Sequence, residues 1–361
     1  MNKTSTKPAR DSSIELLRIL AILGVIALHY NNSSMGGGFA VADSGSFTYR
    51  IMIAIECVAI CAVNLFVMIS GYFMSATNKR TLYKPIKLIA QVVLLNAAMH
   101  LANCAINGSF SLKNLVLAAI PENYFVILFC VLYIFSPYIN LLLSSLNDKQ
   151  VKALALLLFA VFSLYQTAVS EIGAEIGRTL FGMSPVSSQG GQGGYTIVHF
   201  ALMYILGACV RRFNIDLSYK KLLPLTTATL GLMALWLFVN LRRGLGLGEN
   251  VWVYNNPLVI ALAVEVFLVF KRLNIGSIKI INFFAKASFT VYLTHTFFFK
   301  FINIREYAAA SPFVMLAHLT VNAILIYAAG VVIYAVYENT VGRFMSFLEK
   351  KLPIKDIWKL P

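Results

Sequence analysis

The chain has 361 residues, of which 59% are hydrophobic and 12% are charged, and its mean hydropathy is +0.75. Soluble domains are about 45–50% apolar and about 25% charged, so this composition excludes an ordinary soluble protein and indicates a protein within a lipid bilayer. The net charge of +15 would suggest nucleic acid binding in a soluble protein. Here the basic residues lie mainly in short gaps between apolar runs, so we expect no nucleic acid partner.

Apolar runs long enough to cross a bilayer as helices recur along the chain. They predict an all-α fold, a polytopic transmembrane helical bundle of about ten spans. The predicted spans are 12–31, 52–76, 84–106, 121–145, 151–170, 195–212, 221–241, 251–270, 284–303 and 312–338. We therefore divide the chain into an N-terminal tail (1–11), a transmembrane domain (12–340) and a C-terminal tail (341–361).

The distribution of lysine and arginine predicts that both termini are cytoplasmic. With the N-terminus inside, cytoplasmic segments hold most of the basic residues, among them Arg10, Lys79, Arg80, Arg211 and Lys286. The outer side then has two longer loops, 32–50 and 171–194, which are rich in Gly and Ser. Neither loop is a catalytic domain, so any chemistry must take place within or at the edge of the helical bundle.

The first span carries three ionisable residues, Glu15, Arg18 and His29. The separation of Arg18 and His29 is about three helical turns, so both side chains lie on one helix face, about 16 Å apart along the axis. Glu15 lies one turn before Arg18 and can pair with it. Each residue alone could lie at a membrane interface. Charged groups inside a span are functional candidates by default. Because Arg18 and His29 share a face, a functional role for them is as well supported as a location at the membrane interfaces.

Polar residues at the end of the second span and the start of the third form a second candidate group. Ser70 and Gly71 lie in the run "NLFVMISGYFMS", where a small residue can also serve close helix packing. Lys84 and Lys87 lie on one face at the start of the third span. They fit either a positively charged cytoplasmic anchor or an anion site for phosphates.

The ninth span places Ser288, Tyr292 and His295 in one stripe. His295 falls near the middle of the membrane, where it is either functional or an interior histidine with a hydrogen-bond partner. Glu265, in the eighth span, needs a partner as well. The sequence has no zinc-ligand spacing, phosphate loop or nucleotide fingerprint, so we expect no metal site and no ATP-driven transport.

Three motifs resemble one family. The first span has Arg, ten residues and then His in "ELLRILAILGVIALHY", the second ends in "NLFVMISGYF", and the ninth holds "ASFTVYLTHT". In this order the chain resembles the integral-membrane acyltransferase family 3, of the type that O-acetylates bacterial surface polysaccharides. The resemblance covers nearly the whole chain. Family members often have Arg-x-x-Arg after the second span, where this chain has Lys84-Pro85-Ile86-Lys87.

The resemblance implies a multi-pass acyltransferase of the bacterial cytoplasmic membrane. It implies acetyl-CoA as the acyl donor in the cytoplasm and a glycan outside as the acceptor, such as an exopolysaccharide. Arg18, Lys84 and Lys87 would then hold the anionic part of the donor, and His29 would act as general base or covalent acyl carrier. His295, Tyr292 and Ser70 are candidates for positioning the reactants or stabilising an oxyanion.

Two other functions fit parts of the pattern. A transporter or flippase for a lipid-linked sugar would explain the spans, the intramembrane charges and the outer loops, but not the three motifs together. A non-catalytic membrane partner of a polysaccharide assembly complex would need Arg18 and His29 only for stability. Dependence on acetyl-CoA distinguishes the enzyme from both, and the sequence does not indicate the oligomeric state.

Overall fold

The computed structural model describes residues 10–178, 180, 193–245 and 250–351. Most of the predicted tail 1–11, part of the loop 171–194 and the last ten residues lie outside this range. The described elements are α1 (Ser12–Asn31), α2 (Gly38–Val41), α3 (Phe47–Ala59), α4 (Ala62–Met74), α5 (Tyr83–Asn107), α6 (Leu112–Ala119), α7 (Tyr124–Ser145), α8 (Asp148–Phe159), η1 (Ala160–Tyr165), α9 (Gln166–Glu175), α10 (Ile197–Arg212), α11 (Tyr219–Arg242), α12 (Pro257–Leu273), α13 (Lys279–Lys286), α14 (Ser288–Phe298), η2 (Phe299–Phe301), α15 (Ile304–Ala308), α16 (Pro312–Tyr337), η3 (Glu338–Gly342) and α17 (Arg343–Lys351).

The all-helical membrane fold is confirmed, since the described elements are all helices and seven helices among them are long and apolar enough to cross a membrane. Three further predicted spans correspond to shorter helices: α10 has 16 residues, α12 has 17, and α14, which covers most of the ninth span, has 11. The ninth span also takes in the last residues of α13, which begins earlier at Lys279. The count of ten spans and the cytoplasmic termini therefore remain predictions. The sequence missed α6, an eight-residue helix that begins after the N-cap Ser111.

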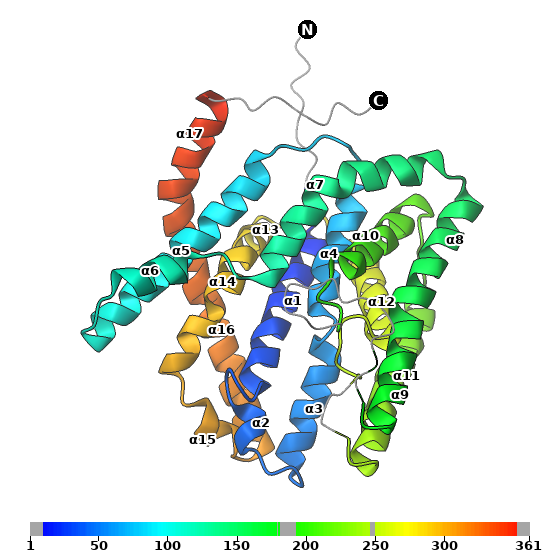
Figure 1. Ribbon diagram of the computed structural model, residues 1–361, viewed down its shortest axis with the longest axis horizontal. Coiled ribbons are helices and arrows are strands. Elements are labelled where there is room, and N and C mark those ends of the chain that lie inside the picture. The colour runs from blue at the N-terminus through cyan, green and yellow to red at the C-terminus, as the bar shows by residue number, and fades with distance from the viewer. Residues whose placement is uncertain (1–9, 179, 181–192, 246–249, 352–361) are drawn as a thin grey trace.

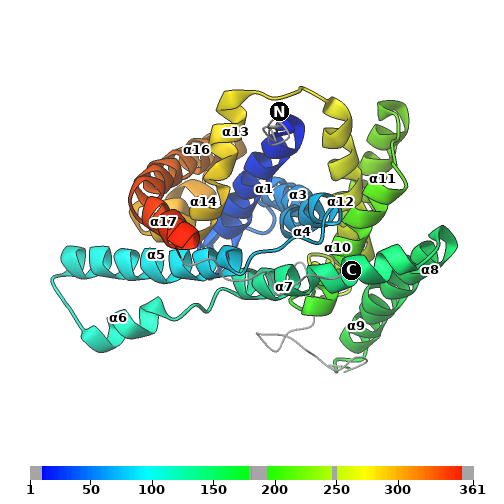
Figure 2. The ribbon, with the colours of Figure 1, turned by 90° about the horizontal axis from the view of Figure 1, so that it is seen from above.

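Helix α1 lies at the centre of the bundle. It contacts α3, α4, α12, α13, α14 and α16, and Figures 1 and 2 show these helices around it. Its residues are apolar around most of the circumference, which is typical of a helix buried on all sides. The start of α1 is fixed by Ser12, whose hydroxyl donates to Asn282 Oδ1 over 2.9 Å and accepts from the Ile278 amide over 2.6 Å. This anchoring sets the depth of Arg18 and His29 in the bundle.

Helices α4 and α10 approach each other through two glycines. A Cβ on Gly71 would lie 2.1 Å from the carbonyl oxygen of Tyr204, and a Cβ on Gly207 would lie 2.2 Å from that of Met68. Each glycine therefore admits the backbone of the facing helix, as small residues do between membrane helices. The sequence-based interpretation of Gly71 as a packing residue is confirmed, and this contact holds Ser70 in place on α4.

Helix α7 runs through Pro137 without a break in the helix. Proline lacks an amide proton, so the carbonyl of Tyr133 loses its normal partner one turn earlier. The hydroxyl of Ser136 donates to that carbonyl over 2.8 Å, and the buried Arg80 donates from Nε to the same hydroxyl over 2.7 Å. Arg80, one of the predicted anchor residues, thus ties the loop after α4 to α7.

The peripheral helices α5, α8, α9, α11 and α16 expose large apolar side chains, such as Leu101, Leu156, Leu235 and Val332. Water would disfavour such a surface, but lipid accepts it. In Figure 2 the far half of α5 and α6 extend away from the bundle as a hairpin.

The glycine contact gives the first prediction. Gly71→Ala should lower the stability of the protein by about 1–3 kcal/mol, because the new methyl group forces α4 and α10 apart. The measurement is the thermal unfolding midpoint of the purified protein in detergent. Gly231→Ala in α11 is the matched control, since no atom lies within 4 Å of its added Cβ. This control should be neutral or stabilising by up to about 1 kcal/mol. Equal midpoints for the two variants would contradict the packing account.

Candidate active site

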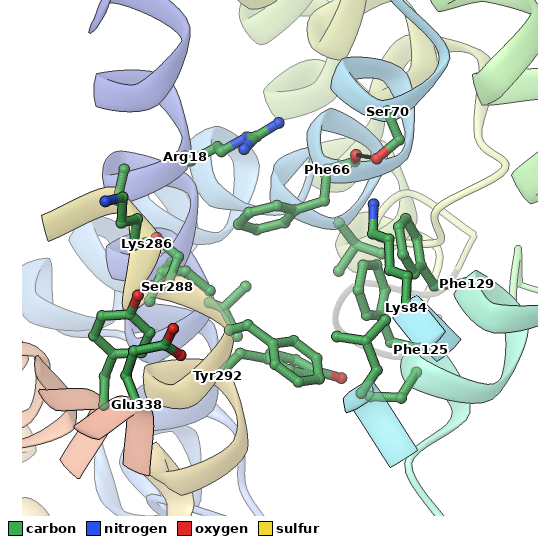
Figure 3. A pocket seen from close by; sticks show the side chains of 18 of the residues that line it. Arg18, Phe66, Ser70, Lys84, Phe125, Phe129, Lys286, Ser288, Tyr292 and Glu338 are labelled. Atoms are coloured by element: carbon green, nitrogen blue, oxygen red, sulfur yellow. Dashed lines mark hydrogen bonds between the residues drawn. The ribbon is translucent and has the colours of Figure 1, made fainter. Parts of the chain in front are cut away.

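A cavity of about 500 Å³ lies between α1, α4, α5, α7, α13, α14 and the end of α16. Figure 3 shows its side chains arranged around an open space. The lining residues are Arg10, Arg18, Ile22, Val25, Val63, Phe66, Ser70, Lys84, Leu88, Phe125, Val126, Phe129, Ala285, Lys286, Ser288, Phe289, Tyr292, Tyr334 and Glu338. Four of the sequence-predicted site residues are among them: Arg18, Ser70, Lys84 and Tyr292.

One part of the cavity is basic. Arg10, Arg18, Lys84 and Lys286 line it, with Glu338 as the acidic lining residue. The predicted pairing of Arg18 with Glu15 is confirmed, with 3.5 Å between Nη1 and Oε1, and Arg10 lies 3.4 Å from the same oxygen. One carboxylate shared by two guanidinium groups leaves an excess of positive charge. This part of the cavity is therefore suited to an anion such as a phosphate.

The two lysines of α5 have different environments. Nζ of Lys84 lies 4.8 Å from the ring centroid of Tyr133 and 5.6 Å from that of Phe129, so aromatic faces hold it at the cavity. Lys87 does not line the cavity and instead pairs with Glu349 of α17. The predicted trio of Arg18, Lys84 and Lys87 is thus brought together only in part. Spacing on α5 could not reveal the partner of Lys87, which comes from the far end of the chain.

Apolar and aromatic side chains make up most of the remaining lining of the cavity. Phe125 packs edge-on against Tyr292, with ring centroids 5.3 Å apart, and against Phe66 at 6.2 Å. The hydroxyl of Tyr292 donates to Asn123 Oδ1 over 2.8 Å, and that of Ser70 donates to the carbonyl of Phe66 over 2.8 Å. Both hydroxyl protons are therefore engaged, and either residue must exchange its partner before it can stabilise an oxyanion.

His29 and His295 lie one helical turn beyond the cavity lining. Arg18, Ile22 and Val25 line the cavity from one face of α1, and His29 continues this face. On α14, Ser288 and Tyr292 line the cavity, and His295 continues their stripe. Both stripes therefore lead from the cavity toward a histidine.

The two histidines are hydrogen-bonded to each other. Nδ1 of His29 lies 2.5 Å from Nε2 of His295, and the rings stack with centroids 4.8 Å apart. His295 is 2% exposed, whereas His29 is partly exposed. The sequence analysis gave both residues as separate candidates. Their contact joins helices 266 positions apart in sequence, which spacing within one helix cannot predict.

The carbonyl next to His295 fixes which nitrogens carry protons. Nδ1 of His295 lies 2.7 Å from the carbonyl oxygen of Tyr292, which can only accept a hydrogen bond, so this nitrogen carries the proton. In a neutral pair, Nε2 of His295 then accepts from Nδ1–H of His29. Nε2 of His29 consequently has a free lone pair, as a general base requires.

Other polar residues of the spans have structural partners. The amide of Asn64 donates to the carbonyl of Tyr254 over 2.8 Å, and its Oδ1 lies 2.8 Å from Nε2 of His199. Glu265 accepts from the hydroxyl of Thr229 over 2.8 Å, which supplies the partner that the sequence left open. These groups connect helices away from the cavity. In the described part of the chain, no group of three or more His, Cys, Asp or Glu residues could hold a metal ion.

Sequence reasoning missed Arg10 and Lys286 as site residues. In the sequence both count only as positive charges of cytoplasmic segments. The features that could have revealed them as site residues are the position of Arg10 just before α1 and that of Lys286 just before the stripe of the ninth span. The aromatic residues Phe66, Phe125 and Phe129 were missed as well. In an apolar membrane helix a lining phenylalanine looks like one that faces lipid.

The second prediction concerns access to the cavity. In a variant without native cysteines, Ser70→Cys should react with a charged methanethiosulfonate reagent, because Ser70 lines the cavity. Ile69→Cys is the control, since Ile69 is fully buried in the core and should react far more slowly. The measurement is the labelling rate in sealed membranes with the reagent on either side. Equal rates for the two cysteines would contradict the cavity, and faster Ser70→Cys labelling from outside would contradict the predicted orientation.

A comparison with protein-family models identifies one match. The model describes an acyltransferase domain, that of acyltransferase family 3, and it matches residues 11–337. No curated protein and no solved structure gives a significant match. The matched region contains Arg18, His29 and His295 together with the entire described cavity lining except Arg10 and Glu338. With membrane-type helices throughout and a family match over most of its length, the chain belongs to acyltransferase family 3 and is a membrane acyltransferase.

Proposed function

We propose that the protein transfers an acetyl group from cytoplasmic acetyl-CoA to a hydroxyl group of a glycan or lipid-linked sugar outside a bacterial cytoplasmic membrane. The observation that carries this proposal is the order of residues along α1 and α14: basic and aromatic side chains line one cavity, and the hydrogen-bonded pair of His29 and His295 lies one helical turn beyond its lining. Coenzyme A has the same order of chemistry along its length, from charged phosphates through a thin pantetheine arm to the thioester.

Arg18, Lys84, Lys286 and Arg10 would bind the phosphates of the donor. Arginine binds phosphate through two parallel N–H donors and lysine acts as a compact charge, so the cluster offers both kinds of contact. The pantetheine arm would pass between Phe66, Phe125 and Tyr292. This passage would bring the thioester from the Arg18 end of α1 toward His29, one helical turn beyond Val25.

His29 would act as the general base. Its Nε2 would take the proton of the acceptor hydroxyl while the oxygen attacks the thioester carbonyl, and coenzyme A would leave as the thiol after accepting a proton. His295 would not touch the reactants in this mechanism. It would position His29 and hold it in the tautomer with a basic Nε2, as the third group of a catalytic triad holds its histidine. A covalent acyl-imidazole on the same nitrogen is compatible with the same geometry.

The third prediction is that His29→Ala lowers acetyl transfer by about 10²–10⁴-fold, the usual contribution of a general base. The measurement is transfer of labelled acetyl from acetyl-CoA to glycan in membranes with matched protein levels. His199→Ala is a control histidine substitution outside the cavity. Full activity of a folded His29→Ala protein would contradict the mechanism, and absence of labelled glycan with the wild type would favour a transporter.

The fourth prediction separates positioning from chemistry. His295→Ala should lower kcat by roughly 10–100-fold, as loss of a supporting hydrogen bond does, and should leave KM for acetyl-CoA nearly unchanged. His295→Gln should recover part of the loss, because its amide oxygen can accept from Nδ1–H of His29. The measurement is steady-state kinetics with the pH profile of kcat. If His295→Gln and His295→Ala have identical profiles, His295 does not act through the tautomer of His29.

A further inference from the structure

Helix α17 spans the gap between α16 and α5 beside the cavity. It follows α16 through the π-helical turn η3, and it ends next to the first turns of α5 (Figures 1 and 2). Nζ of Lys87 lies 2.5 Å from Oε2 of Glu349, and the hydroxyl of Tyr83 donates to the carbonyl of Leu348 over 3.4 Å. Both helices that α17 connects contribute lining residues, since Tyr334 belongs to α16 and Lys84 to α5.

The lysine held by Glu349 is next to the basic part of the cavity. Lys84 and Lys87 are three positions apart on α5 and therefore share a face of the helix. Lys84 lines the cavity, whereas the charge of Lys87 is directed to the carboxylate of Glu349. Lys87 is about one helical turn from Lys84, so a Lys87 side chain released from Glu349 adds a further cation next to this part of the cavity.

The contact between α17 and α5 is weak enough to be exchanged. The side chains of Lys87 and Glu349 are 33% and 37% exposed, and ion pairs of such exposure contribute little to stability. No residue of α17 is buried, so few other contacts hold this helix in place.

The turn η3 is suited to a hinge. The side chains of Asn339 and Thr340 donate to the carbonyls of Ala335 and Val336, so side chains as well as backbone amides bind the last carbonyls of α16 before this turn. A Cβ on Gly342 would lie 2.7 Å from the carboxylate of Glu338, a residue that lines the cavity. Irregular turns of this kind within helices occur frequently at functional sites.

We propose that Glu349 is a built-in competitor of the acyl donor for Lys87. In the conformation described, Glu349 neutralises Lys87 and α17 is docked on α5. A phosphate group of the donor takes Lys87 from Glu349, and α17 is released about η3. This inference rests on the proposed function, because the competing ligand is the phosphate of an acyl-CoA.

Charge and geometry favour the phosphate in this competition. Glu349 presents one carboxylate to one lysine, whereas the several phosphates of the donor would engage Lys87 together with basic residues that line the cavity. The docked helix therefore lowers donor affinity without preventing binding. It also excludes weaker anions that contact Lys87 alone.

The test is the kinetics of four variants with acetyl-CoA as the varied substrate. Glu349→Gln should lower KM for acetyl-CoA by about two- to fivefold at unchanged kcat, because the competitor is removed. Lys87→Gln should raise KM by about tenfold or more, since a charged hydrogen bond to the donor is lost. The double variant should behave like Lys87→Gln alone. The swapped variant Lys87→Glu/Glu349→Lys, which retains the ion pair, should also have a raised KM.

Glu306→Gln is the matched control, because Glu306 is an exposed carboxylate bonded to Asn303 near α15, and it should leave KM unchanged. A wild-type KM in the swapped variant, or a raised KM for Glu349→Gln, would overturn the proposal and make the pair purely structural. Absence of acetyl-CoA-dependent transfer by the wild type would instead overturn the proposed function, so the two failures are distinguishable.

Discussion

The distance between Arg18 and His29 is fixed by the helix that carries both. Along α1 they are separated by about 16 Å, roughly half of the apolar thickness of a bilayer. Because α1 packs among several other helices and is anchored at its start by Ser12, this distance cannot adjust to a ligand. In the proposed function the donor would have to match it, with phosphates at one end and a reactive carbonyl at the other.

The other helices supply the residues that surround Arg18 and His29. Helix α14 provides His295, which binds Nδ1 of His29 and leaves its Nε2 available. Helices α4 and α7 contribute Phe66, Phe125 and Phe129 to the cavity lining, and the glycine contact packs α4, which carries Ser70 and Phe66, against α10. Helices α5 and α13 add the lysines of the basic part. Buried polar pairs such as Asn64 with His199 serve the packing of these helices and not the cavity.

Properties that depend on one helix were predictable from the sequence. The shared face of Arg18 and His29, the Glu15–Arg18 pair, the stripe of Ser288, Tyr292 and His295 and the packing role of Gly71 all follow from helical periodicity. Hydropathy likewise located the helices. An apolar run that crosses lipid must make its backbone hydrogen bonds within the run, so it forms a helix.

Properties that depend on contacts between distant helices were not predictable. The His29–His295 bond, the Lys87–Glu349 pair and the lining role of Lys286 join segments whose arrangement no local pattern determines. The break between α13 and α14, near the start of the ninth span, was missed because hydropathy does not detect a short turn between two helices. Lys87 is the clearest example. Its spacing from Lys84 suggested that both lysines bind one ligand, but in the structure Lys87 pairs with Glu349.

The proposed function requires one path between a donor site on the cytoplasmic side and chemistry that serves an acceptor on the other side. The most direct measurement is transfer from labelled acetyl-CoA in sealed membrane vesicles of both orientations, with wild type and His29→Ala at equal levels. The account predicts that label reaches glycan in the compartment opposite to the donor, only when acetyl-CoA is on the Arg18 side, and only with His29 present. Equal labelling from either side, or labelling that survives His29→Ala, would contradict it.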